Sequence, residues 1–493
     1  MSDLEVELKL NIPYRHVYDA ILQDPSLFHQ SIAREYETTY YDTADGRLRT
    51  NGLAYRIRRT GDEFTATVKD GGRHEGGLHI RHEWNRPLPQ NEPDITAFDD
   101  LPVGKTLRAA IGPDSLEPLF TTSFIRHGGH YTAADGSVIE VAADLGTILC
   151  GSNQEPISEL ELELKSGQIA SVLRLGAHLA EGYGLTAHSR SKFARGLALA
   201  GLAPDMPQAS PPQPHKHSPL PRELTQLLIY STQTILSAYE AYIAAPTDKE
   251  AVHELRVKIR QLRSLLAFFR PLIDHEQYET AQNMLKTLAG DFACLRELDV
   301  LHDEWNKLAP ALSSSIAGRM ALDKCLQAAR HREHTRLAEQ HDRGLSTAAL
   351  LTLWADLTDP SHDDFPHEQL TMGEYAERQF EDWLHRLARD HHQLDSADYT
   401  AIHNLRLSVK KSRYVLSCLE PVLTKRHRKM LPRLKNLQDC LGAICDGYRH
   451  TAVLAQLAER SRSPLLQYER GIMTGWQLTG RQRLLAKLAK LEI

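Results

Sequence analysis

A short run near the start of the chain places two carboxylates and an amine at alternating positions. Residues 4–10 read Leu-Glu-Val-Glu-Leu-Lys-Leu, so an extended strand carries Glu5, Glu7 and Lys9 on one face and the apolar side chains on the other. Carboxylates bind hard cations and an ammonium group binds anionic oxygens, so this face could hold a polyanion together with its metal ion. An exposed strand with cross-strand ion pairs has the same pattern.

The same alternation of charged and apolar residues recurs as far as residue 165. It is present in 55–58, 64–69 and 80–85, and it is clearest in 159–165, which reads Glu-Leu-Glu-Leu-Glu-Leu-Lys. If such strands close into a barrel, their charged faces line a lumen and their apolar faces pack outward on helices. The candidate lumen residues from this pattern are Glu5, Glu7, Lys9, Arg56, Arg58, Lys69, Arg81, Glu159, Glu161 and Glu163.

A lumen lined by both signs of charge suits a metal-bound polyphosphate. Arginine offers a forked pair of donors to anionic oxygens, and lysine adds a point charge. Carboxylates hold a hard cation such as Mg²⁺ or Mn²⁺. A metal ion and a polyphosphate in one polar tunnel indicate phosphoryl-transfer chemistry.

Turn-forming residues separate the alternating runs, at 60–62, 70–72 and 135–136. This half of the chain therefore reads as an antiparallel β domain, with helical segments near 14–31 and 168–182.

The character of the sequence changes at a segment that contains seven prolines, residues 204–221, which predicts an extended linker. After it the apolar period becomes 3.6, and residues 252–266 match residues 402–416, which indicates two related helical halves. We predict an α+β chain with an N-terminal antiparallel β-barrel tunnel at 1–203, the linker at 204–221, and an all-α domain at 222–493 whose halves, 222–358 and 368–493, are joined by the polar stretch 359–367.

The helical half carries two stripes of basic residues at matching positions. In each repeat a histidine is followed by basic residues at offsets 3, 7 and 10, which places all four on one side of a helix. A basic stripe is usually a solvated helix face, but these stripes are almost purely basic in a chain of net charge −6, and a bound polyanion would relieve their mutual repulsion. The two stripes are His253, Arg256, Arg260 and Arg263, and His403, Arg406, Lys410 and Arg413.

The composition narrows the class of protein. The net charge of −6 over 493 residues gives no general indication of nucleic-acid or membrane binding. No stretch approaches the roughly 18 apolar residues of a membrane span. The six cysteines show no zinc-site spacing, and the N-terminus lacks the basic and apolar regions of an export signal. We expect a cytoplasmic protein with reduced thiols.

The N-terminal motifs resemble the CYTH family, also called triphosphate tunnel metalloenzymes. The opening run is similar to the family's ExExK signature, and the runs 40–43, 55–58 and 67–69 follow in the family's order, as do the later residues Arg81, Glu83, Arg126, Glu140, Asp144, Glu159, Glu161 and the pair Ser191-Lys192. Asn85 departs from the pattern, because many members have an acidic residue there.

The resemblance implies roles for these residues. Glu5, Glu7 and Lys9 would be catalytic. Which of the three carboxylates in 159–163 touches metal stays open, because Glu163 could lie solvated at the strand end. The implied metal ligands are Glu5, Glu7, Asp144, Glu159, Glu161 and Glu163, and the implied substrate-binding residues are Lys9, Arg56, Arg58, Lys69, Arg81, Glu83, Arg126 and Lys192.

The helical half resembles CHAD, the conserved histidine α-helical domain, through its two basic stripes and their duplication. The segment 295–299 is similar to the family's Arg-Asp-x-Asp run with Glu297 in place of the first aspartate, and Asp446 could be its counterpart in the second half. The resemblance implies two helical bundles that bind inorganic polyphosphate through the eight stripe residues. Nucleic acid would make similar phosphate contacts, but no helix-turn-helix, RRM or KH signature and no aromatic platform accompanies the basic residues.

The two resemblances together imply an inorganic triphosphatase that cleaves tripolyphosphate to pyrophosphate and phosphate. We expect tripolyphosphate and inorganic polyphosphate as partners, Mg²⁺ or Mn²⁺ as cofactor, no nucleic acid and no membrane, with association with polyphosphate granules as one possible location. The alternatives are a CYTH enzyme acting on thiamine triphosphate or nucleoside triphosphate or cyclising ATP, and a non-catalytic polyphosphate-binding protein.

Overall fold

The computed structural model describes residues 4–28, 32–202, 211–312, 321–342, 344–358, 370–459 and 463–491. The chain forms two compact units, one of residues 1–211, 232–240 and 340–359, and one of residues 212–231, 241–339 and 360–493. Most of the predicted linker and the predicted joining stretch at 359–367 lie outside the described residues.

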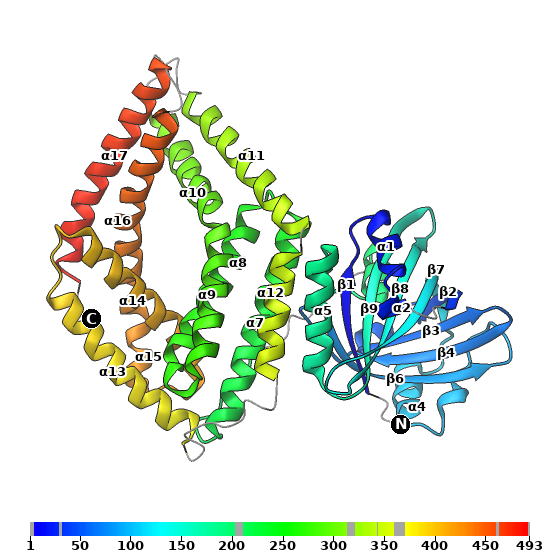
Figure 1. Ribbon diagram of the computed structural model, residues 1–493. Helices are drawn as coiled ribbons and strands as arrows, with labels where there is room; N and C mark the ends of the chain where they lie inside the picture. Colours follow the sequence, from blue (N-terminus) through cyan, green and yellow to red (C-terminus); the bar gives the residue numbers. More distant parts are fainter. Residues whose placement is uncertain are drawn as a thin grey trace. The chain divides into compact units, whose positions relative to one another are not determined.

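The first unit is built on a closed antiparallel barrel of eight strands, which confirms the predicted fold (Figure 1). The strands follow one another around the barrel in the order β1-β9-β8-β7-β2-β3-β4-β6, and β6 pairs with β1 to close it. Two short strands, β5 (Arg73–Glu75) and β10 (Thr186–Ala187), extend the sheet. The barrel strands are β1 (Leu4–Asn11), β2 (Ile32–Asp42), β3 (Leu53–Thr60), β4 (Glu63–Asp70), β6 (Leu78–Leu88), β7 (Glu117–Thr132), β8 (Val138–Cys150) and β9 (Asn153–Ser166).

The apolar faces of the strands point outward and are covered by helices. Leu8 and Leu10 of β1 are fully buried, and a side chain at Gly176 of α5 (Ile169–Tyr183) would come within 2.4 Å of Leu8, so this helix packs directly on β1. α12 (Leu345–Thr358) packs in turn on α5 within the same unit. The remaining helices of this unit are α1 (Arg15–Leu22), α2 (Pro25–Phe28), α3 (Arg47–Thr50), α4 (Pro102–Ile111) and α6 (Lys192–Leu199). Covering the outer face leaves the charged face for the lumen.

The second unit is helical, and its halves repeat the same local design. α8 (Lys249–Phe268) and α14 (Tyr399–Cys418) each begin after an aspartate, Asp248 or Asp398, whose side chain accepts a backbone N–H of the first turn. Each helix leads into a short 3₁₀ turn, Arg270–Leu272 or Glu420–Val422. The other helices are α9 (His275–Asp291), α10 (Ala293–Leu308), α13 (Met372–His392), α15 (Lys425–Arg428), α16 (Met430–Glu459) and α17 (Pro464–Leu488). α7 (Leu220–Ala244) and α11 (Ala321–Asp342) are divided between the units, since residues 232–240 and 340–342 belong to the first.

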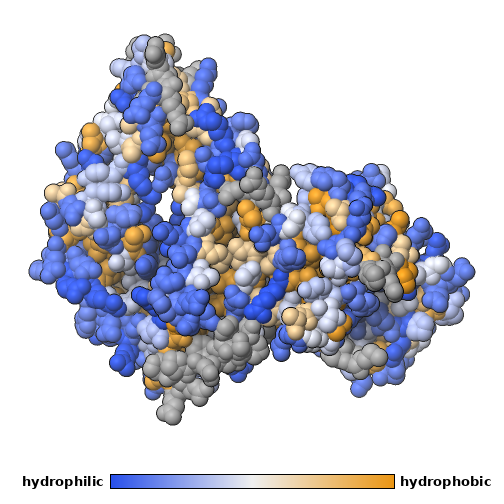
Figure 2. Space-filling view, in the orientation of Figure 1, coloured by the Kyte–Doolittle hydropathy of each residue, from blue (hydrophilic) through white to orange (hydrophobic). Residues whose placement is uncertain are grey.

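Hydrophilic side chains dominate the visible surface of the helical unit, as Figure 2 shows. Its apolar side chains gather between helices, in a core formed by residues of α10, α11, α16 and α17 around the fully buried Trp305. Within the described ranges, none of the helices is long and apolar enough to cross a membrane.

Candidate functional site

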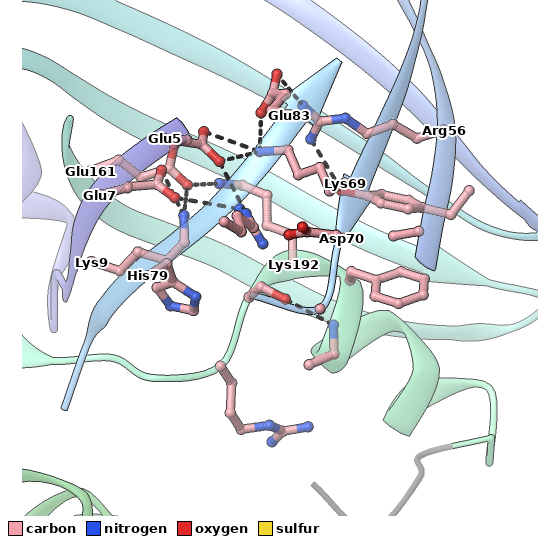
Figure 3. Close-up of a pocket in the computed structure, with 18 of the residues that line it drawn as sticks. Glu5, Glu7, Lys9, Arg56, Lys69, Asp70, His79, Glu83, Glu161 and Lys192 are labelled. Atoms are coloured by element: carbon pink, nitrogen blue, oxygen red, sulfur yellow. Dashed lines mark hydrogen bonds and ion pairs between the residues drawn. The ribbon is translucent and has the colours of Figure 1, made fainter. Parts of the chain in front are cut away.

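The barrel encloses a cavity of about 460 Å³ whose walls carry most of the charged residues selected from the sequence. The strands β1, β3, β4, β6, β7 and β9 and the first turn of α6 contribute these residues. Figure 3 shows Glu5, Glu7 and Glu161 gathered on one side and Arg56 across from them. The predicted residues in the wall are Glu5, Glu7, Lys9, Arg56, Arg58, Lys69, Arg81, Glu83, Arg126, Glu161, Glu163 and Lys192.

Pairing of the strands explains how residues far apart in sequence meet here. Lys9 of β1 is the cross-strand partner of Glu161 in β9, and Glu5 is the partner of Arg81 in β6. Because the side-chain period of a strand is two, this register places every second residue of each strand on the lumen face. The alternation in the sequence and the register of the sheet thus assemble the site together.

Glu5 lies between two cations. Lys69 Nζ donates to both carboxylate oxygens, at 3.1 and 2.9 Å, and Arg81 Nε donates to Oε2 at 3.0 Å. Burial opposes ionisation, but Lys69 and Arg81 outweigh it and lower the pKa of Glu5. Glu5 therefore acts as a fixed negative charge at this end of the cavity.

Glu7 has a different environment although it is only two residues away. It is 4 % exposed, and Lys9 Nζ lies 2.8 Å from its Oε1. Its Oε2 lies 3.5 Å from Arg81 Nη2 and accepts no hydrogen bond from the described part of the chain. Burial and the nearby Glu161 carboxylate raise the pKa of Glu7 to about 7. An orphaned carboxylate oxygen that is costly to ionise is suited to binding a cation.

Three further carboxylates form a buried acidic cluster: Asp144 of β8 and Glu159 and Glu161 of β9. One ligand oxygen from each lies within 4.8 Å of the others. Glu161 reaches the cavity, whereas Asp144 and Glu159 lie behind its wall and are at most 1 % exposed. Their oxygen donors and close spacing fit a hard divalent cation.

Cations surround this acidic cluster. Lys192 Nζ lies 2.7 Å from Asp144 and 2.9 Å from Glu161, and it also contacts Glu159. Arg126 donates a forked pair of hydrogen bonds to Asp144, at 2.7 and 2.6 Å, and contacts Glu161. Burial alone would lower the pKa of Lys192, but Asp144, Glu159 and Glu161 outweigh it and raise the pKa. The Lys192 ammonium therefore lies where the three carboxylates converge.

The opposite wall is predominantly basic. Arg56 contacts the Tyr40 hydroxyl at 3.4 Å and Glu83 at 3.7 Å. Arg58 has no carboxylate partner among the described residues. Its guanidinium lies 4.7 Å from the Tyr36 ring centroid, and its buried Nε has no acceptor within the described ranges. Burial together with Arg56 and Arg126 lowers the pKa of Arg58 to about 10. This wall has donors that an anion could satisfy.

Asn85, which stands where many members of the resembled family have an acidic residue, orients the carboxylate of Glu83. Its Nδ2 donates to Glu83 at 3.0 Å, and its Oδ1 accepts from Thr67 at 2.7 Å. Glu83 also contacts Lys69. Burial opposes ionisation of Glu83, but Lys69 and Arg56 hold its pKa well below the usual range. The amide at position 85 therefore serves Glu83 without adding another negative charge.

Glu163 lies in the wall but outside the acidic cluster. Its side chain is 30 % exposed and pairs with Lys165 at 2.7 Å, and Lys165 also pairs with Glu140 at 2.8 Å. Burial raises the pKa of Glu163 despite Lys165. These three residues form a more solvated part of the cavity wall.

Arg195 of α6 is a residue that the sequence reasoning missed. It is 5 % exposed, its Nη1 donates to Glu159 at 2.9 Å, and its Nε donates to Glu155 at 2.7 Å. It does not line the cavity but holds Glu159 from behind. Its signal in the sequence is its position three residues after Lys192, which places both side chains on one face of a helix. Ser191 caps this helix by accepting the backbone N–H of Ala194.

The two basic stripes of the helical unit lie on α8 and α14, which pack against each other. The last residue of each stripe has a matching partner: Arg263 donates to Gln282 at 3.1 Å, and Arg413 donates to Gln438 at 2.6 Å. The pKa values of both histidines are lowered, mainly by burial. The next contribution comes from Arg296 for His253 and from Arg406 for His403. The two stripe ends therefore each have a hydrogen-bond acceptor, and the two histidines favour their neutral form.

The middle residues of both stripes converge with one residue of α16. We call the set Arg256, Arg260, Arg406, Lys410 and Arg449 the inter-repeat basic cluster. The Nε atoms of its four arginines are buried and have no acceptor within the part of the chain that the structure describes. Burial and then Arg406 and Arg260 lower the pKa of Lys410 to about 7, which indicates that the two stripes share one electrostatic environment.

Two family models match successive parts of the chain. Residues 3–197 match the family model of the CYTH domain, and residues 231–455 match that of the CHAD domain. A solved CHAD domain from the plant Ricinus communis is 21 % identical, with a TM-score of 0.44, and the match covers 57 % of this chain and 96 % of that one.

Two curated relatives share part of the chain. An inorganic triphosphatase of Haemophilus influenzae is 33 % identical over 210 residues, which are 40 % of this chain and 54 % of that protein. An uncharacterized protein of Mycobacterium tuberculosis is 26 % identical over 330 residues, which are 62 % of this chain and 60 % of that protein. The chain therefore spans between half and two thirds of the length of these relatives.

Proposed function

Because residues 3–197 of this chain form a CYTH domain and residues 231–455 form a CHAD domain, we propose that the protein is a metal-dependent inorganic triphosphatase with a polyphosphate-binding helical domain. The observation that carries the proposal is the barrel cavity, where a basic wall faces Glu5, Glu7 and Glu161, with Asp144 and Glu159 clustered beside Glu161 behind the wall. The similarity to an inorganic triphosphatase supports tripolyphosphate as substrate.

Carboxylates in the cavity wall and directly behind it would hold the metal ion. Asp144, Glu159 and Glu161 supply closely spaced oxygens, and Glu7 supplies an oxygen that accepts no hydrogen bond from the described residues. We infer Mg²⁺ or Mn²⁺, since all these donors are carboxylate oxygens. A bound ion of this kind stabilises the charge that develops on phosphate oxygens and lowers the pKa of water.

The basic wall would hold the phosphates. Arg58 has unused donors, while Arg56, Lys69 and Arg81 can exchange part of their contacts with Glu5 and Glu83 for contacts with phosphate oxygens. Such contacts position the terminal phosphorus for attack by water and compensate the negative charge of the substrate. Tripolyphosphate would leave as pyrophosphate and phosphate.

The direct test measures phosphate release from tripolyphosphate, ATP and thiamine triphosphate, each with Mg²⁺, Mn²⁺ or a chelator. We expect fast release from tripolyphosphate that the chelator abolishes. Comparable or faster release from ATP or thiamine triphosphate would replace the proposed substrate. No release from any of the three by folded protein would leave the non-catalytic polyphosphate-binding reading.

We propose polyphosphate as the ligand of the helical unit on the strength of the inter-repeat basic cluster. Four buried arginine Nε donors of the cluster have no acceptor among the described residues. A chain of phosphates presents many negatively charged acceptors that could bind them. Binding of polyphosphate would allow association with polyphosphate granules. Retention of the full chain on immobilised polyphosphate, weakened by salt, is the expected result.

A further inference from the structure

Two carboxylates lie within the inter-repeat basic cluster and are used by neither proposed activity. Glu297 belongs to α10 of the first half, and Asp446 belongs to α16 of the second. Glu297 follows Arg256 by 41 positions and Asp446 follows Arg406 by 40, so they occupy related places in the repeats. The four helices involved pack as the pairs α8–α14, α8–α10, α14–α16 and α10–α16.

Arg449 joins these two carboxylates. Its Nη1 donates to Glu297 at 3.0 Å, and its Nη2 contacts Asp446. Asp446 also accepts from Arg406 at 3.3 Å. A chain of alternating charges, Glu297–Arg449–Asp446–Arg406, therefore connects the two halves.

The two carboxylates compensate only part of the positive charge around them. Arg260 and Lys410 have no carboxylate within ion-pair distance among the described residues, although Lys410 lies in the field of Arg406, Arg260, Arg449 and Asp446. The side chains of Glu297, Asp446 and Arg449 are 27 to 32 % exposed, so an incoming anion can reach them. Phosphate oxygens bind guanidinium groups as carboxylates do, and both cannot occupy the same donors.

We propose that Glu297 and Asp446 are internal counter-anions of a single polyphosphate site shared by both halves. They pair with Arg449 and Arg406 when the site is empty, and they release those guanidinium groups to phosphate oxygens when polyphosphate binds. This inference rests on the proposed function of the helical unit, and it names two residues that regulate the affinity of that unit for polyphosphate. The two acids hold the unliganded cluster together and weaken its binding of anions.

The inference predicts an unusual combination of effects. Neutralising an acid should tighten binding, because one fewer negative charge repels the ligand and one more guanidinium is available to it. The same change should destabilise the unliganded protein, because a partly buried arginine loses its partner. An acid that merely positioned the arginines for phosphate would weaken binding when neutralised.

The test measures binding of medium-chain inorganic polyphosphate to the full chain, with the variants Glu297→Gln, Asp446→Asn and the double variant. We expect each single variant to bind about three- to tenfold more tightly and to have a lower melting temperature without ligand. The charge-retaining variants Glu297→Asp and Asp446→Glu should bind like the wild type. Asp390→Asn on α13, an exposed acid paired with Arg389, controls for net charge and should leave the affinity unchanged.

The outcomes separate this inference from the proposed function. If the wild type binds polyphosphate and the neutralised variants bind equally or more weakly, the counter-anion role is wrong while the polyphosphate site stands. If Asp390→Asn tightens binding as much as Glu297→Gln, the effect is one of net charge and the inference also fails. If folded wild type binds no polyphosphate, the proposed function of the helical unit fails as well.

Discussion

At the scale of single residues, Glu5 and Glu7 show how two carboxylates of one motif acquire different properties. Both lie on the lumen face of β1 and contact two cations, but Glu7 is more deeply buried and lies beside the Glu161 carboxylate. The pKa of Glu5 falls and that of Glu7 rises to about 7. Two glutamates of one motif therefore differ: Glu5 is a stable anion, whereas ionisation of Glu7 is costly.

Replacing Glu7 by glutamine should separate activity from stability. A carboxylate whose pKa is raised in the folded state destabilises the fold as pH rises from about 4.5 to about 7, because the folded protein must then ionise a group that prefers its proton. At pH 8 the glutamine variant should be more stable than the wild type by about 1–3 kcal/mol, with the difference vanishing near pH 4. Phosphate release should be lost.

Thermal melts of both proteins without metal, from pH 4 to pH 8, check the stability effect, and the tripolyphosphate assay checks the activity. A variant that keeps metal-dependent turnover would contradict the assignment of Glu7 to the site. If the stability of the wild type does not fall relative to that of the variant as pH rises, Glu7 does not have a raised pKa.

Arg195 should support Glu159 without touching substrate. In Arg195→Met the buried Glu159 and the partly buried Glu155 lose their guanidinium partner, which should cost about 2–4 kcal/mol at neutral pH. Glu159 should also lose its fixed orientation, so the thermal stabilisation produced by added Mn²⁺ should shrink. Differential scanning calorimetry with and without Mn²⁺ measures both effects.

Arg15→Met provides the control, because Arg15 pairs with Asp19 on the surface with both side chains largely exposed. Its cost should stay below about 1 kcal/mol, and the Mn²⁺ response should not change. An Arg195 variant with full Mn²⁺ stabilisation would show that the guanidinium is structural only.

At the scale of elements, the alternation of charged and apolar residues predicts the strands and their lumen faces, because the period of a strand is two. It does not predict what approaches the wall from behind. The pairing of Arg195 with Glu159 and of Lys192 with Asp144 depends on where α6 packs, which no local pattern encodes. In the helical unit, the stripes predict α8 and α14, but the glutamine partners of Arg263 and Arg413 lie on other helices.

Two adjacent glycines of β7 also differ in a way that the sequence pattern does not predict, and they allow the packing of α2 on the barrel to be tested. A side chain at Gly129 would come within 2.0 Å of the Leu27 carbonyl oxygen in α2, whereas one at Gly128 would meet nothing within 4 Å. Gly129→Ala should therefore push α2 away from the barrel and destabilise the fold by about 1–3 kcal/mol. Gly128→Ala should be neutral or stabilise by up to about 1 kcal/mol.

Urea unfolding of the two alanine variants measures the difference, and the matched backbone change removes any general effect of glycine replacement. Equal stabilities would show that α2 does not restrict β7. The sequence Gly-Gly alone does not distinguish the two positions, because only the packing of α2 makes one of them special.

At the scale of the whole molecule, each candidate site is confined to one compact unit. The lumen residues all belong to the first unit, and the inter-repeat basic cluster belongs wholly to the second. Side chains that share no partner usually contribute independently to binding and stability. The two proposed activities should therefore be separable by substitution.

Reversing Arg260 and Lys410 to glutamate should abolish one activity and spare the other. Both cations lack carboxylate partners in the described chain, so the change removes no ion pair and instead places acids where phosphate would bind. Polyphosphate affinity should fall more than tenfold, while tripolyphosphate turnover should stay within about twofold of the wild type. Glu7→Ala should do the reverse, abolishing tripolyphosphate turnover and sparing polyphosphate binding.

The control is the exposed pair Lys286→Glu and Lys324→Glu, which makes the same change in net charge and should leave both activities nearly unchanged. Loss of turnover together with polyphosphate binding in the reversed variant, with its fold intact, would mean that the helical unit takes part in hydrolysis and that the two sites are coupled.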